Sequence, residues 1–456
     1  ADPSNPIKSI DKVKSILGGG NDNLEFRFND GDTFNMTNGI GVGGSNVVFT
    51  DYGSGKAPVL YWVGVKDYVA MIWASGTSDR VTVQNLTLQT KFTGSDKTSM
   101  PDAIKASGDN LVVRNNTFMD VGYAVNCNGK PDGVIVEKNI SPTQTSLRSY
   151  FVWVAGNDHV ILGNKVANST REAVIRAVDA NRILIGYNSF TNNTGDKIDT
   201  AKNTLTIHKG SYAYIVGNDL HKGPLHIGPL GEGDGQKGPD QRWNYAVVEG
   251  NILDTESFTL HGAQHVMYRN NISLTNGYPA YNIQGYNSIY KRQVVDATYV
   301  NNTGINKDAD GIMFAVGSGT VGVTIQNNLY VAPDLSPGGN GAASPVYVAA
   351  NDLSGFKSIS NNVWASGKNG TWYAAGGVNY LFANGTKAVG FKTPAEWNSF
   401  AQVGKDIFSE VSMKGYIPAA NSAAADAGMQ VDGVFFDFYG NARPANGPIT
   451  AGAVEV

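Results

Sequence analysis

A chain of 456 residues exceeds the size at which a single simple globular core stops growing, so we expect several domains or one repeat-built unit. Only 16% of the residues are charged and 55 are glycine, which favours strands and turns over amphipathic helices. The net charge of -4 excludes a generally basic nucleic-acid-binding protein, and no run of 18 apolar residues is present to span a membrane.

The start of the chain predicts a cap rather than a targeting segment. Residues 6–18 have the apolar spacing of an amphipathic helix, with Ile7, Ile10, Val13 and Ile16/Leu17 on one side. A solenoid needs such a cover over its open first coil, so we interpret residues 1–30 as an N-terminal cap. No signal peptide is recognisable, and we interpret Ala1 as a processed terminus of a secreted, extracellular or periplasmic protein.

A short β-branched run that ends in asparagine recurs along the chain. These asparagines are Asn85, Asn116, Asn139, Asn164, Asn188, Asn218, Asn251, Asn271, Asn302, Asn328 and Asn362. Several spacings are 23 to 25 residues, which is typical of a solenoid with short strands in each coil. Asparagine tolerates the left-handed backbone of a tight turn, and stacked coils would align the amides in a ladder.

We therefore predict an all-β chain that folds as one right-handed parallel β-helix domain over residues 1–456. Its coils occupy residues 31–365, and residues 366–456 form C-terminal coils and a cap, with partial helix at 392–411. A β-propeller is the main structural alternative, but its blades need about 40–45 residues each.

Five of the six histidines fall in one short window, at His208, His221, His226, His261 and His265. The largest irregular segments, 191–203 and 228–243, also border this window, and function concentrates where regular structure is interrupted. If the strands lie one coil apart, His208 or Lys209 stacks with His226 and His261 on a shared face. The isolated His159 is interpreted as a hydrogen-bonded turn residue.

A surface of lysine, histidine and arginine on an acidic protein suits a uronic-acid polysaccharide as partner. β-Elimination needs a cation that neutralises the uronate carboxylate and a base that removes the C5 proton. The candidate catalytic residues are Lys209, His208, Arg176, His226 and His261. The candidate substrate-binding residues are Arg242, Trp243, Lys237 and Lys222, although Trp243 could instead anchor its loop. Glu232 and Asp234 of the glycine-rich loop are candidate ligands for Ca²⁺, a possible cofactor.

Two segments resemble polysaccharide lyase family 6, which includes chondroitinase B and alginate lyases. The resemblance covers roughly residues 30–300 and centres on TLTIHKGS and, one coil earlier, REAVIRAVDAN. It implies a β-helical lyase in which His208 replaces the family arginine, Lys209 replaces the family histidine, and Glu172 matches a Ca²⁺-ligand position. Ala177 or Arg176 stands where that family has its lysine base, so the base would have moved, for example to Lys209.

The sequence thus predicts a secreted polysaccharide lyase, with two alternatives left open. A glycoside hydrolase could use a carboxylate pair from Asp196, Asp199, Glu232, Asp234 and Asp240. A non-catalytic carbohydrate-binding β-helix, like a tailspike shaft, would need neither set of residues.

Overall fold

The structure is a computed structural model, and the chain divides into two compact units, residues 1–207 and 208–456. It describes residues 7, 9–18, 20–65, 67, 69–92, 100–143, 150–169, 173–191, 204–229, 242–254, 256–275, 279–285, 292–306, 312–332, 344–348, 354–366, 378–382, 387–391, 395, 398–399 and 405–456. The prediction of a single domain over the whole chain stays a prediction.

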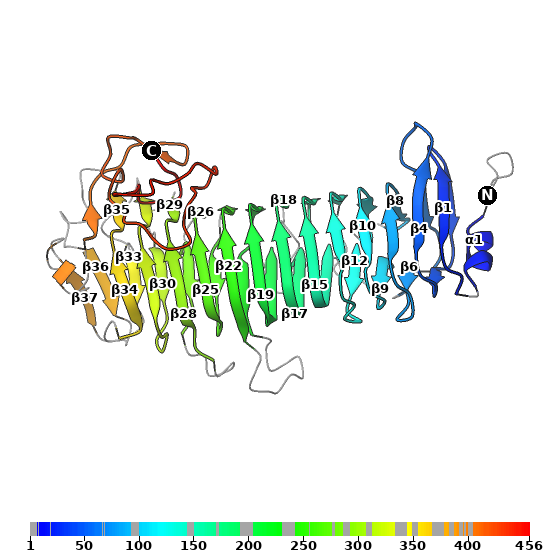
Figure 1. The fold of residues 1–456 in the computed structure, drawn as a ribbon, viewed down its shortest axis with the longest axis horizontal. Coiled ribbons are helices and arrows are strands. Elements are labelled where there is room, and N and C mark those ends of the chain that lie inside the picture. Colours follow the sequence, from blue (N-terminus) through cyan, green and yellow to red (C-terminus); the bar gives the residue numbers. More distant parts are fainter. Residues whose placement is uncertain are drawn as a thin grey trace. The chain divides into compact units, whose positions relative to one another are not determined.

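Each coil of the first unit has three faces, and strands on one face pair in parallel with those of the next coil (Figure 1). The first face holds β1 Leu24–Asn29, β4 Val47–Tyr52, β7 Val81–Gln84, β10 Val112–Arg114, β13 Ile135–Glu137 and the later halves of β15 Val152–Leu162 and β17 Ile175–Gly186. The second holds β2 Thr33–Met36, β5 Val59–Trp62, β8 Thr87–Thr90, β11 Thr117–Met119, β14 Ile140–Thr143, β16 Lys165–Ala167 and β18 Ser189–Thr191. The third holds β3 Ile40–Val42, β6 Ala70–Ala74, β9 Asp102–Ala106, β12 Val125–Cys127 and the earlier halves of β15 and β17.

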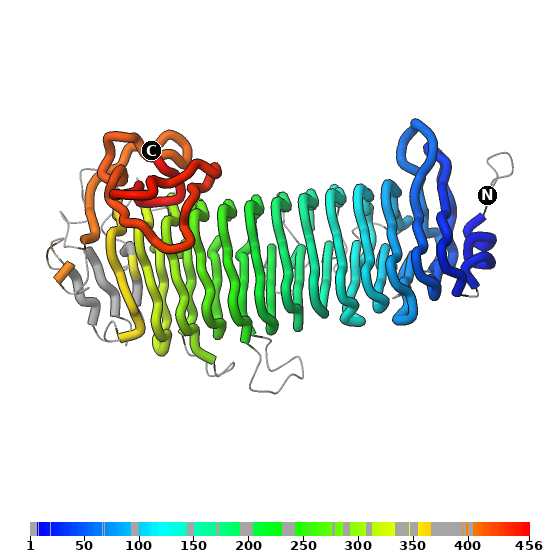
Figure 2. Tube along the Cα trace, viewed as in Figure 1, coloured from blue at the N-terminus to red at the C-terminus, as the bar shows by residue number. Residues whose placement is uncertain are grey.

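The second unit repeats this plan, and its trace runs coil by coil in Figure 2. Its first face holds the later part of β19 Leu205–Val216, then β22 Trp243–Glu249, β25 Gln264–Arg269, β28 Val295–Val300, β31 Val323–Gln326 and β34 Phe356–Ser360. The second holds β20 Asp219–His221, β23 Ile252–Asp254, β26 Ile272–Thr275, β29 Thr303–Asn306, β32 Leu329–Ala332, β35 Val363–Ser366 and β38 Ile407–Phe408. The third holds β21 Leu225–Gly228, β24 Phe258–Leu260, β27 Tyr281–Ile283, β30 Ile312–Val316, β33 Ser344–Val348 and β36 Val378–Phe382.

Two strand pairs depart from the parallel pattern of the coils. β37 Lys387–Phe391 pairs antiparallel with β36, and β39 Met413–Lys414 forms a hairpin with β40 Ile417–Pro418. All other strand pairings described are parallel and join equivalent faces, so each unit is a right-handed parallel β-helix, as the asparagine repeat predicts.

The interior is apolar because alternate side chains of each strand point into the coil. In the second unit, an aromatic stack fills this space. Phe258 and Tyr281 stack with ring centroids 5.1 Å apart, and Tyr281 continues onto Phe314 at the same distance. Tyr268 and Tyr299 stack at 4.8 Å, and burial raises the pKa of both hydroxyls. Stacked aromatic rings thus fill the interior of these coils.

The predicted asparagine ladder lies at the corner between the first and second faces. The side-chain Oδ1 of Asn271 accepts from both the backbone N–H and Nδ2 of Asn251, each at 3.0 Å. The same pattern joins Asn116 through Asn188 in the first unit and Asn218 through Asn362 in the second. It ends at Asp406, whose carboxylate accepts from Asn362 and from the indole N–H of Trp364.

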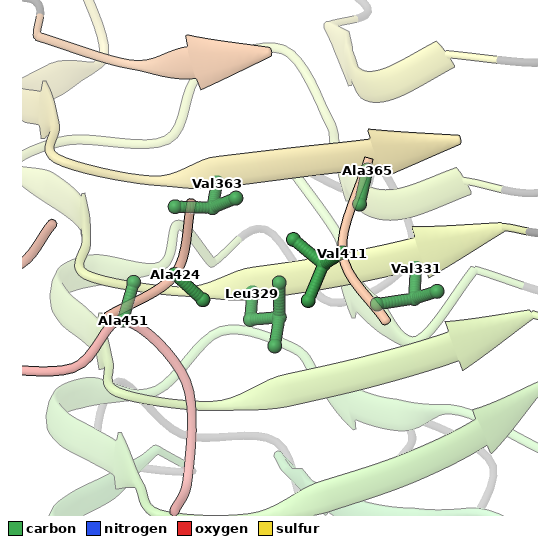
Figure 3. Packing of buried hydrophobic residues seen from close by; sticks show 7 residues of the cluster. All are labelled: Leu329, Val331, Val363, Ala365, Val411, Ala424 and Ala451. Carbon is green, nitrogen blue, oxygen red and sulfur yellow. The ribbon is translucent and has the colours of Figure 1, made fainter. Parts of the chain in front are cut away.

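The predicted helix is present at the start of the chain, and the C-terminal segment packs against the second face of the coils. Helix α1 Ile10–Leu17 begins at Ser9, whose hydroxyl accepts from Lys12 N, and it buries Ile10, Val13 and Leu17. Most of the segment predicted to be partly helical, 392–411, lies outside the described residues. The final segment packs on the coils of the second unit through the cluster shown in Figure 3: Leu329, Val331, Val363, Ala365, Val411, Ala424 and Ala451.

One buried arginine ties this C-terminal segment to the coils. Arg443 pairs with Glu455 at 2.6 Å and donates to Asn270 Oδ1 at 3.0 Å and to the carbonyl of Gly452 at 2.9 Å. Because a buried guanidinium needs both a counter-charge and acceptors, these contacts make the docking of the segment specific.

Candidate functional site

Three of the predicted histidines form one cluster in the second unit. The His208 and His226 rings meet edge to face with centroids 5.2 Å apart, and the His226 and His261 rings do so at 4.6 Å. They come from β19, β21 and the residue that follows β24, and β21 pairs with β24 in parallel. The expectation that stacked coils would bring these imidazoles together is confirmed as geometry. We call this group the histidine cluster.

The cluster depends on a glycine at position 228. A Cβ atom there would lie 2.8 Å from Nε2 of His226 and 3.1 Å from Cβ of His261. Gly228 therefore leaves the space into which the His226 ring packs. Burial lowers the pKa of His261 to about 4, so this imidazole is neutral at neutral pH.

The tautomer of His208 follows from its backbone contact. Its Nδ1 lies 3.0 Å from the carbonyl oxygen of Pro229, which can only accept. Nδ1 therefore carries the proton in the neutral ring, and the lone pair resides on Nε2. In this tautomer, Nε2 is the ring nitrogen that carries the basic lone pair.

Lys209 follows directly at a corner of the coil. Its φ of 47° is left-handed, a region that residues other than glycine adopt mainly where the surroundings enforce it. Consecutive residues of a regular strand point to opposite sides. The bend instead lets both His208 and Lys209 remain partly exposed. An imidazole and an ammonium group are thus neighbours at the edge of the cluster.

Two arginines lie on the coils that follow. The carbonyl of Arg242 accepts from Gly210 N at 3.2 Å, and its guanidinium donates to Gln264 Oε1 at the same distance. Cβ of Arg292 lies so close to Gly262 that a side chain at position 262 would collide with it. Arg292 is thus beside the coil turn that follows His261. Arg292 was not predicted from the sequence, because the segment before it lacks the β-branched run ending in asparagine that would fix its register.

The prediction that Trp243 contacts substrate is wrong. Its side chain is completely buried and its indole N–H donates to the carbonyl of Tyr245 at 3.4 Å, so it anchors β22. The alternating pattern of β22 places it on the inward side.

The other two histidines of the window lie outside the cluster. His221 is on β20, where its ring contacts Asp219 at 2.9 Å and Asp254 at 3.2 Å. The candidate Lys222 follows as an exposed turn residue with φ 58°. His265 is exposed, stacks on Tyr245 at 4.8 Å and lies 3.4 Å from Asp296.

Arg176 and His159 belong to the first unit. Arg176 lies on the third face of β17, and its Nη1 donates to the hydroxyl of Tyr150 at 3.1 Å. The interpretation of His159 as a turn residue is wrong, because it is buried within β15 and burial lowers its pKa.

Four predicted residues, Glu172, Glu232, Asp234 and Lys237, lie outside the described residues. Among those described, no group of three or more histidine, cysteine, aspartate or glutamate side chains could hold a metal ion. The Ca²⁺ site stays a prediction. In the same part of the chain, no helix is long and apolar enough to cross a bilayer.

No protein-family profile matches the chain, and no curated protein matches its sequence significantly. Solved structures do match its fold. A PL6 alginate lyase in complex with a trisaccharide is 11% identical, with a TM-score of 0.54 over 91% of this chain and 89% of that one. The alginate lyase AlyF-OU02 in complex with G6 is 10% identical, with a TM-score of 0.50 over 93% and 91% of the two chains.

The Dettilon tailspike protein is also similar, at 15% identity and a TM-score of 0.50. The match covers 77% of this chain but only 66% of the tailspike, so this chain spans less than two thirds of that protein. Identities this low carry information about the fold alone. The predicted resemblance to polysaccharide lyase family 6 is thus confirmed as a likeness in fold: the chain is a parallel β-helix similar to PL6 alginate lyases.

Proposed function

We propose that this protein cleaves a uronic-acid-containing polysaccharide by β-elimination at the histidine cluster. The supporting observation is the juxtaposition of the His208 imidazole, whose Nδ1 contacts the Pro229 carbonyl, with the side chain of Lys209 at a partly exposed corner of the coil. β-Elimination needs such a pair, since one group must take a proton while another neutralises a carboxylate. Polymers of this kind occur outside cells, and we propose an extracellular or periplasmic location.

Each group has one role in this mechanism. Lys209 contacts the uronate carboxylate, which makes the C5 proton more acidic and stabilises the negative charge that develops on its removal. His208 Nε2 takes that proton. The electron pair forms the C4–C5 double bond as the bond from C4 to the glycosidic oxygen breaks, and the departing oxygen takes a proton from solvent water. His226 and His261 hold the His208 ring in position by edge-to-face packing.

The test begins with product detection. The protein is incubated with alginate, pectate, glucuronan or glycosaminoglycans, and the unsaturated product is measured by ultraviolet absorbance. New reducing ends without this absorbance would indicate hydrolysis and reject the proposal. Absence of both with every polymer would equally reject it.

Three substitutions then separate the two roles. We expect His208→Ala and Lys209→Ala each to lower kcat by about 100-fold or more, the usual scale for an acid–base group. Lys209→Arg keeps the charge but cannot deprotonate at ordinary pH, so it should retain far more activity than Lys209→Ala. Equal loss in both Lys209 variants would make Lys209 the base. The controls are His265→Ala and Lys357→Ala, whose side chains lie on the first face.

A further inference from the structure

A row of side chains crosses five consecutive coils on the third face of the first unit. The row consists of Trp73, Lys105, Asn126, Trp153 and Arg176. Strand register places Trp73 beside Lys105, Lys105 beside Asn126, Asn126 beside Trp153, and Trp153 beside Arg176. The residues that flank each member on its strand are buried inside the coil, so the row lies on the outer side. Trp73 is exposed, Lys105, Trp153 and Arg176 are partly exposed, and Asn126 between them is buried.

Trp73 opens the row with an exposed aromatic surface. Its side chain is 47% exposed, and it stacks on no other ring in the described part of the chain. A large aromatic ring held in the open on a strand offers a flat apolar surface with a polar N–H at its edge. The C–H face of a pyranose ring is complementary to such a surface.

Lys105, the next member, supplies a positive charge. It forms no ion pair or hydrogen bond within the described residues. The carboxylate on its own strand, Asp102, instead accepts from Asn126 Nδ2 at 2.8 Å and from Tyr123 N at 3.2 Å. The row therefore presents a cation directly beside an exposed indole.

Trp153 and Arg176 close the row as a fixed pair. The Trp153 ring stacks on Tyr123 at 5.8 Å, and the Arg176 guanidinium lies over the Trp153 ring at 5.9 Å. Arg176 also donates to the Tyr150 hydroxyl at 3.1 Å. These contacts hold both side chains in one conformation, which lowers the entropic cost of binding a ligand against them.

We propose that this row is a binding track for an acidic polysaccharide chain that runs along the coil axis. Four coil steps separate Trp73 from Arg176, or about 19 Å at the usual strand spacing. Trp73 stacks on a sugar ring, and Lys105 and Arg176 contact uronate carboxylates further along the chain. The choice of an acidic polymer rests on the proposed function, whereas the track places binding residues in a unit that lacks the histidine cluster.

Binding is measured by affinity electrophoresis in gels that contain alginate, pectate, glucuronan or chondroitin sulfate, with dextran as the neutral polymer. Each variant is made in a His208→Ala background so that the polymer is not degraded. We expect Trp73→Ala and Lys105→Ala each to weaken binding of one acidic polymer by about tenfold, the scale of one charge-assisted hydrogen bond or one good stacking contact. Raising the salt concentration should erase the effect of Lys105→Ala and spare that of Trp73→Ala.

The matched controls are Tyr187→Ala and Lys138→Ala, exposed residues of the same unit at the opposite corner. They should bind as the parent does, and all variants should keep the parent's thermal unfolding midpoint. Parent-like binding by both Trp73→Ala and Lys105→Ala would overturn the track, as would equal loss in the controls or stronger binding to dextran. Retained binding without any unsaturated product would reject the β-elimination proposal and leave the track in place.

Discussion

In the second unit, Asn251 and Asn271 occupy equivalent positions on consecutive coils and make the same hydrogen bonds. On the third face of the same coils, His226 instead lies beside Thr259, and Thr259 beside Asn282. The corner repeats one residue because each copy completes the bonding of its neighbour. The face varies because its side chains point outward, where no neighbouring coil dictates their identity. The repeated corner asparagines therefore stabilise the fold, whereas the variable residues of the third face are available for binding or catalysis.

The largest effect should come from breaking the repeating corner. Asn271→Ala removes the acceptor of Asn251 N and Nδ2 and the donor to the carbonyl of Val248, all buried. Leaving buried polar groups without partners should lower the free energy of unfolding by about 4 kcal/mol, measured by denaturant titration. The exposed Lys357→Ala is the control. A loss as small as that of the control would show that the ladder contributes little.

A smaller effect should follow pH at the histidine cluster. The pKa of His261 is about 4 in the folded protein and about 6.5 when unfolded, so the unfolded chain binds the extra proton between these values. Stability should therefore fall as pH drops from about 6.5 to about 4, by about 3 kcal/mol, and then level off. His261→Gln should remove this component from the pH dependence of unfolding. Identical pH profiles for wild type and variant would contradict the assignment.

A substitution that crowds the histidine cluster should lower the free energy of unfolding by a smaller amount. Gly228→Ala forces the new methyl group against the His226 ring, and overpacking of this kind costs about 2 kcal/mol. Because the displaced ring packs on His208, kcat should fall as well. Gly41→Ala, where the added Cβ meets nothing within 4 Å, is the matched substitution on a strand of the first unit. An unchanged kcat in Gly228→Ala would show that the packing of the histidine cluster does not affect catalysis.

The smallest expected effect concerns Ca²⁺. If Glu172 or the segment around Glu232 and Asp234 holds the ion, EDTA should slow turnover by about tenfold, or about 1.4 kcal/mol in activation free energy. Added CaCl₂ should restore the rate, and Glu172→Ala should be insensitive to both treatments. A rate that EDTA leaves unchanged would rule out an exchangeable metal.

The fold was predictable because the asparagine repeat reports a buried side-chain hydrogen bond that recurs from coil to coil. The left-handed turn residue that the sequence predicted at the asparagine is instead the residue before it, as with Asn270 before Asn271. The cluster of His208, His226 and His261 was predictable because the fixed period of the repeat converts sequence distance into adjacency. The prediction for Trp243 was wrong because the sequence does not fix the register of its strand. A shift of one residue decides whether the side chain points into the coil or toward solvent. Trp73 and Lys105 were missed because a single exposed side chain on a regular strand leaves no local signature. Only the pairing of five coils reveals the row.

Asp406 takes the place of an asparagine at the last position of the ladder, and this limits where coils could be added to the solenoid. The Asp406 carboxylate accepts hydrogen bonds from Asn362 but has no N–H to donate to a further coil. The asparagine ladder therefore runs in one direction and ends at Asp406. Duplicating coils upstream of this point would preserve the pattern of amide hydrogen bonds, whereas a coil appended beyond it would meet a carboxylate that has no N–H to donate. Length variation in this architecture should therefore arise by internal insertion.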